Sequence, residues 1–99
     1  MKKFEIKEFK KEIVANFGSI AKLKKHLVSI SKDEYGCNYS EVNVYGCRIF
    51  YTSNPNHFCK FAVSIKGVGM SDTLALCKSS ITKAGKERGC NSTRHYLDI

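Results

Sequence analysis

The stretch that decides the fold is residues 4–30, which read FEIKEFKKEIVANFGSIAKLKKHLVSI. Apolar residues recur there every three or four positions, and this spacing places them along one side of a helix. One helix is predicted over residues 4–17, with an apolar stripe formed by Ile6, Phe9, Ile13 and Phe17. A second helix is predicted to follow it, with a stripe formed by Ile20, Leu23, Leu27 and Ile30. Gly18 is expected to end the first helix because glycine tolerates positive φ, and Ser19 is expected to cap the second.

The second predicted helix also carries a basic side. At 100° per residue, four polar residues fall opposite its apolar stripe, namely Lys22, Lys25, Ser29 and Lys32. We expect this side to contact a partner, with its three lysines binding phosphate groups.

The middle of the chain predicts strands. Residues 33–40 are rich in turn formers, and residues 42–52 and 57–66 alternate as the two strands of a hairpin do. The alternation changes phase at Tyr45 and Gly46, which predicts a β-bulge there.

A third helix is predicted to begin at Ser71 and to end at Gly85. Its apolar stripe would be Leu74, Cys77, Ile81 and Ala84. Together these elements predict a single α+β domain over residues 1–99: two N-terminal helices, an antiparallel β-hairpin or small sheet, and a C-terminal helix packed on it.

The outer side of the predicted hairpin mixes cations with aromatic rings. The residues that share it are Arg48, Phe50, Phe58, Lys60 and Lys66. Such a surface suits single-stranded nucleic acid, because cations neutralise phosphates while rings stack on bases. The alternative is that a helix covers Phe50 and Phe58 and leaves the cations at the rim.

The chain carries 17 Lys and Arg residues against nine Asp and Glu, a net charge of +8. The positive field of so small a protein attracts polyanions, which favours DNA or RNA as the partner. The alternative is a lysine-rich surface that is merely solvated. No apolar run is long enough to span a bilayer, and charges interrupt the N-terminus where a signal peptide needs an apolar stretch. We therefore expect no membrane contact and a cytoplasmic protein.

No C-x-x-C pair occurs among the five cysteines, which are Cys37, Cys47, Cys59, Cys77 and Cys90. Structural zinc sites usually have close-paired ligands, and the tightest His/Cys pair here is His57 with Cys59. Cys47 could approach that pair across a hairpin, which would give three ligands at best. We therefore expect no metal and no other cofactor, and we interpret Cys47, Cys59 and Cys77 as small buried hydrophobes in a reduced protein.

Two short segments carry a family resemblance. Residues 12–27, EIVANFGSIAKLKKHL, resemble the opening of the helix-turn-helix in phage Cro and repressor proteins, where a polar residue after Phe-Gly caps the next helix. Residues 46–52, GCRIFYT, resemble the first strand of the Cro hairpin. The resemblance implies a DNA-binding regulator of a phage or another mobile element, with its recognition helix within residues 31–45. Lys24 stands where that family usually has a small residue.

The sequence contains no P-loop, G-x-S-x-G, H-E-x-x-H or Rossmann glycine motif, so we expect a protein that binds without catalysis. Nucleic-acid binding is the function that the sequence favours. One alternative is a small phage-type inhibitor, for example an anti-CRISPR, that blocks a host defence protein or nucleoprotein complex. Another is a ribonuclease toxin that would use His57 with Lys60, Arg48 and Tyr51.

Overall fold

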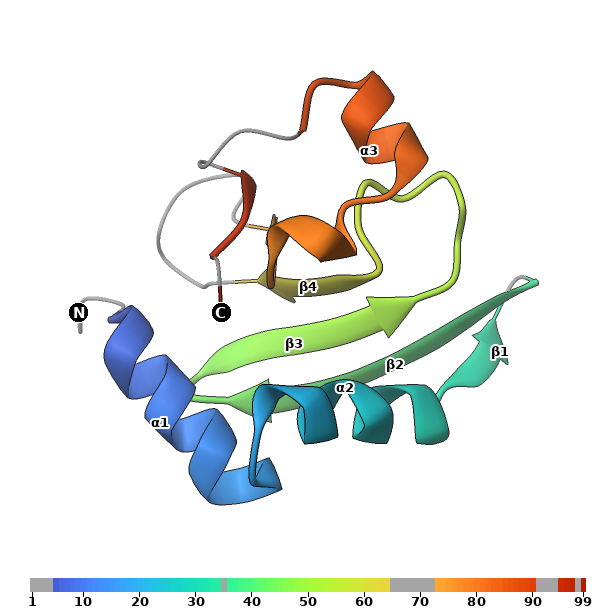
Figure 1. Cartoon of the computed structure of the whole chain (residues 1–99). Helices are drawn as coiled ribbons and strands as arrows, with labels where there is room; N and C mark the ends of the chain where they lie inside the picture. The colour runs from blue at the N-terminus through green and yellow to red at the C-terminus, as the bar shows by residue number, and fades with distance from the viewer. Residues whose placement is uncertain (1–4, 35, 65–72, 91–94, 98) are drawn as a thin grey trace.

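The structure is a computed structural model and describes residues 5–34, 36–64, 73–90, 95–97 and 99. Its elements in chain order are α1 (Ile6–Phe17), α2 (Ile20–Ser29), β1 (Lys32–Glu34), β2 (Cys37–Val44), β3 (Cys47–Thr52), β4 (Phe61–Ser64), β5 (Thr73–Ala75), the 3-10 helix η1 (Lys78–Ser80) and α3 (Lys83–Glu87). The five strands form one antiparallel sheet in the order β1-β2-β3-β4-β5, so each strand pairs with the next along the chain. The α+β class is confirmed, with α1 and α2 together on one side of the sheet (Figure 1).

The two N-terminal helices form where the apolar spacing predicts them. Gly18 ends α1 with a φ of 95°, and its N–H donates to the carbonyl of Val14 at 2.8 Å. Ser19 caps α2, and its hydroxyl accepts from the backbone N–H of Lys22 at 3.1 Å. The central members of both stripes are fully buried, namely Phe9, Ile13, Leu23 and Leu27.

The cap at Ser19 yields a first prediction. Ser19→Ala should lower the free energy of unfolding by about 1 kcal/mol, because the N–H of Lys22 would lose its acceptor. Ser29→Ala is the matched control, since the Ser29 hydroxyl only donates back to the carbonyl of His26 in the same helix. Urea denaturation should show a change within about 0.5 kcal/mol for the control. Equal losses in both variants would contradict the capping role.

The sheet separates two apolar cores. The side chains of residues that pair across antiparallel strands lie on the same face of the sheet. Ile49 pairs with Val42 on one side and with Val63 on the other, and all three lie on the face toward the helices. The opposite face carries Phe50 and Ala62, which pack with a smaller cluster of buried residues: Cys59, Ala75 and Ile81. The C-terminal segment therefore covers the face that α1 and α2 leave open.

The predicted bulge at Tyr45 and Gly46 is wrong. Both residues have positive φ, 56° and 73°, and they form a two-residue turn that joins β2 to β3. Positive φ at both central positions suits the right-handed twist of a hairpin, which explains why the alternation changes phase there. Residues 42–52 consequently belong to two strands, and the second strand pairs with both of its neighbours.

The segment 33–40, predicted as a turn, is also largely strand. It contains most of β1 and the first half of β2, whose residues pair as Asp33 with Asn38. The recognition helix expected within residues 31–45 is accordingly contradicted, because the described part of this stretch is sheet. The described residues of this stretch therefore do not form the helix with which a Cro protein reads the major groove.

The predicted third helix is wrong for most of its length. Leu74 lies in β5, Cys77 precedes η1, and Gly85 sits inside the short helix α3 instead of ending a long one. Pairing with β5 satisfies backbone groups along the edge of β4 that a helix would leave open. Of the remaining residues in these predictions, Ile65, Lys66 and Ser71 lie outside the described part of the chain.

Candidate functional site

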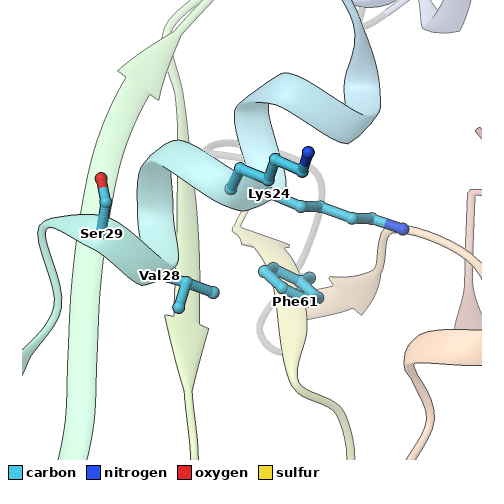
Figure 2. Close-up of a pocket in the computed structure, with 5 residues that line it drawn as sticks. Lys24, Val28, Ser29 and Phe61 are labelled. Atoms are coloured by element: carbon cyan, nitrogen blue, oxygen red, sulfur yellow. The ribbon is translucent and has the colours of Figure 1, made fainter.

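A groove runs between α2 and β4 on the helix side of the sheet. It has a volume of about 370 Å³ and is lined by Lys24, Lys25, Val28, Ser29 and Phe61. Figure 2 shows Val28 of α2 and Phe61 of β4 reaching toward each other, which gives the groove an apolar floor. Val28 is 46% exposed although it is a large hydrophobic residue, so the floor is open to a ligand.

The arrangement of the helices leaves this groove open. Helix α2 packs on β2 and β3, so the neighbouring strand β4 lies beside the helix and not beneath it. Phe61 is half-buried, and its ring centroid lies 5.1 Å from that of Tyr51, its partner across β3 and β4. The ammonium of Lys24 lies 5.5 Å from the Phe61 ring centroid, within the range of a cation–π contact.

The wall that α2 contributes is strongly basic. The helix reads IAKLKKHLVS, with three lysines and no acidic residue. Lys22 and Lys25 are exposed, and Lys24 is half-buried between the helix and the sheet. Several lysines beside an apolar floor are the combination that attracts a ligand with anionic and flat apolar parts.

Lys24 also joins the groove to a second polar cluster. Its ammonium donates to the sulfur of Cys77 at 3.3 Å, and the hydroxyls of Ser79 and Ser80 lie 3.1 and 3.2 Å from the same sulfur. Partial burial raises the pKa of the Cys77 thiol, but the hydrogen bonds from Ser79, Ser80 and Lys24, together with the charge of Lys24, outweigh it and lower the pKa to about 7. Cys77 is half-buried, so the interpretation of it as a small buried hydrophobe is wrong, whereas Cys47 and Cys59 are buried as predicted.

The predicted basic side of the second helix is only partly assembled. Lys22 and Lys25 lie on α2 as expected, and Lys25 lines the groove. Lys32 is exposed but begins β1, because α2 ends at Ser29. The prediction missed Lys24. This residue lies between the apolar and the basic sides of the helix, so the periodicity assigned it to neither side.

The predicted outer side of the hairpin is not a free stacking surface. Phe50 is only 7% exposed, since the guanidinium of Arg48 and the imidazole of His57 lie 4.9 and 5.6 Å from its ring centroid. Arg48 is itself paired with Glu41, and Phe58 is half-buried against His57. Phe50 is thus covered, as the alternative held, by these side chains and by the cluster that it forms with residues of the C-terminal segment.

The remaining cations of that predicted surface lie elsewhere. Lys60 is exposed and lines a separate hollow with Ser79 and Lys83, on the loop that precedes β4. Lys66 lies outside the described residues. The structure therefore does not join Lys60 to Arg48 in one patch with exposed rings.

The imidazole of His57 forms hydrogen bonds with the backbone of Cys59. Its Nδ1 lies 2.8 Å from the carbonyl oxygen of Cys59 and donates to it in the tautomer that has the proton on Nδ1. In the other tautomer Nδ1 accepts from the backbone N–H of Cys59 at 3.3 Å. Cys47 belongs to the core on the other face of the sheet, so it does not join His57 and Cys59. Tyr51 also lies on that other face, which separates it from His57, with which it was predicted to form a ribonuclease site.

Among the described residues, no three His, Cys, Asp or Glu side chains gather closely enough to hold a metal ion.

No family of known proteins, no curated protein and no solved structure matches the chain. Within the described ranges, no helix has both the length and the hydropathy needed to cross a membrane.

Proposed function

We propose that the protein binds single-stranded nucleic acid through the groove between α2 and β4, without catalysis, and acts as a small cytoplasmic regulator. The observation that carries this proposal is the pairing of Lys24 and Lys25 with an open apolar floor of Val28 and Phe61. Phosphates would contact the ammonium groups, while a base would lie against the floor. The free thiols of all five cysteines suit a reducing compartment.

Single strands fit this groove better than duplex does. Duplex DNA is usually read by a helix that enters the major groove. The Cro resemblance implied such a helix within residues 31–45, but the described part of that stretch contains the strands β1 and β2. A single strand exposes its bases, which can reach an apolar floor close to the lysines. Paired bases in a duplex are stacked and cannot do so.

The salt dependence of binding tests the proposal. If about four phosphates of a single strand are neutralised, the slope of log affinity against log salt concentration should be near −3. Fluorescence anisotropy with a labelled 12-nucleotide single strand and its matched duplex should show tighter binding of the single strand. A flat salt dependence, or a preference for the duplex, would overturn the proposal.

A protein-directed inhibitor is the second candidate. Val28 on α2 is 46% exposed, and Ile30, the C-cap residue of this helix, is 40% exposed. Exposed apolar groups are enriched where proteins bind one another. The same lysines would then face acidic groups of the partner. Such a protein should copurify with a partner in stoichiometric amount after nuclease treatment, whereas a nucleic-acid-binding protein should lose its bound material.

A further inference from the structure

Cys77 has surroundings that differ from those of the two buried cysteines. Burial alone raises the pKa of Cys47, and burial together with Cys90 raises that of Cys59 to about 12. The ammonium of Lys24 and the hydroxyls of Ser79 and Ser80 instead converge on the Cys77 sulfur from two segments, with Lys24 lying 53 positions away in the sequence. Cys77 is half-buried, whereas Cys47 and Cys59 are buried.

We propose that Cys77 is a modification site at which the thiolate exchanges with small anionic disulfides. The ammonium of Lys24 at 3.3 Å, and the hydroxyls of Ser79 and Ser80 at 3.1 and 3.2 Å, can all donate to a thiolate and so favour it, and the thiolate is the nucleophilic form of cysteine. The neighbouring groove supplies space of about 370 Å³ and the positive charges of Lys24 and Lys25 for the carboxylates of such a molecule. Lys24 lines the groove of the proposed function and also contacts the Cys77 sulfur, but the exchange reaction needs no nucleic acid and is tested without it.

The reaction is a thiol–disulfide exchange. The Cys77 sulfur attacks one sulfur of the small disulfide, so a new S–S bond forms as the old one breaks. The departing sulfur leaves with the electron pair as a thiolate and takes a proton from water. The Cys77 sulfur is thereby oxidised and the departing sulfur is reduced, and no further oxidant is required. The ammonium of Lys24 loses its thiolate partner when the mixed disulfide forms.

Two opposing trends determine how much faster Cys77 should react than an ordinary thiol at pH 7. With a pKa of about 7, half of the Cys77 thiol is ionised at pH 7, against about 1% for a thiol whose pKa stays at 9.0. For each unit by which the pKa falls, the rate constant of the thiolate falls by roughly 0.4 to 0.5 logarithmic units. A pKa lower by about two units therefore slows the thiolate about eightfold. The net gain at pH 7 is about sixfold, so the midpoint of the pH–rate profile is a sharper readout than the rate itself.

Alkylation of the native full-length protein with iodoacetamide between pH 5.5 and 10 provides the first test. Tryptic peptides separate Cys77, in residues 67–78, from Cys90, in residues 89–94, so Cys90 normalises the labelling. The Cys77 profile should have its midpoint near pH 7. Lys24→Met keeps an unbranched side chain beside Phe61 but removes the charge, and it should slow the reaction at pH 7 at least twofold and raise the midpoint. A wild-type midpoint near pH 9 would overturn the proposal even if the variant fails to fold.

The identity of the disulfide is tested with two probes of opposite charge. Glutathione disulfide carries carboxylates, whereas cystamine is a dication of smaller size. At pH 7 and low salt, glutathione disulfide should react with Cys77 at least three times faster than cystamine once each rate is divided by that for Cys90. Equal ratios, or faster reaction with cystamine, would overturn the assignment of an anionic disulfide.

Discussion

Reversal of the two groove lysines, Lys24→Glu with Lys25→Glu, should weaken binding of a single-stranded oligonucleotide about 100-fold. Each change replaces an attraction to phosphate by a repulsion, which we take as about 1.4 kcal/mol or a tenfold change in Kd. The slope of log affinity against log salt should also flatten by about 1.4, since each phosphate contact on a single strand contributes about 0.7. Anisotropy titrations at several salt concentrations measure both quantities.

Two lysines on α1 provide the matched control. Lys10→Glu with Lys11→Glu changes the net charge from +8 to +4, as the groove variant does, because each reversal removes two charges. Both residues are exposed and line a different hollow, on α1 beside Val14. We expect the control to lose less than about fivefold in affinity, through the overall field alone. Equal losses would mean that total charge governs binding and that the groove has no special role. Thermal unfolding of both variants shows whether Lys24→Glu harms the fold.

The helical half of the fold could be predicted because its signals are local. Apolar spacing, Gly18 and Ser19 act within one or two turns of chain, and tertiary packing reinforces them by burying Leu23 and Leu27. Lys22 and Lys25 follow from the same periodicity, which fixes the side of α2 opposite the buried stripe. The α+β class needed no more than this and the alternation in residues 57–66.

The sheet could not be predicted in detail because its pairings connect distant residues. Leu74, Cys77 and Ile81 have helical spacing, yet Leu74 pairs with Val63 of β4 and Ile81 bridges to Cys59. A three-residue strand such as β5 gains its stability from a neighbour, and its own sequence does not reveal that neighbour. Residues 33–40 are likewise rich in turn formers, so their sequence did not predict the strands β1 and β2, which pair with each other.

The polar cluster of the candidate site was missed for the same reason. Ser79 and Ser80 follow Cys77 closely in the sequence, and hydroxyls at that spacing are a signal that could have been noted. The decisive charge comes from Lys24, on another element. The sequence also could not show that α2 would stop short of covering Phe61.

Gly85→Ala should destabilise the protein by about 3 kcal/mol, although the same change in an exposed helix stabilises by up to about 1 kcal/mol. A Cβ at position 85 would lie 2.2 Å from the carbonyl oxygen of Phe58 and 2.9 Å from Cγ2 of Ile81. The carbonyl of Phe58 also accepts from the N–H of Thr82 at 2.9 Å, so it cannot retreat without breaking a bond that holds α3 to the loop. Overpacking in a buried contact therefore outweighs the gain in helix propensity.

Lys86→Ala is the control for this change, because Lys86 is exposed in the same helix and its replacement should alter stability by about 0.5 kcal/mol or less. Urea denaturation of the three proteins, followed by circular dichroism, gives the difference directly. Unchanged or increased stability in Gly85→Ala would mean that α3 does not rest on the Phe58 loop. Lys60 lies in the same loop, and its N–H donates to the carbonyl of Ser80 at 2.8 Å. Because the Ser80 hydroxyl lies beside the Cys77 sulfur, a displaced α3 would also disturb the surroundings of Cys77. The pH midpoint of Cys77 alkylation should therefore rise in Gly85→Ala and stay unchanged in Lys86→Ala.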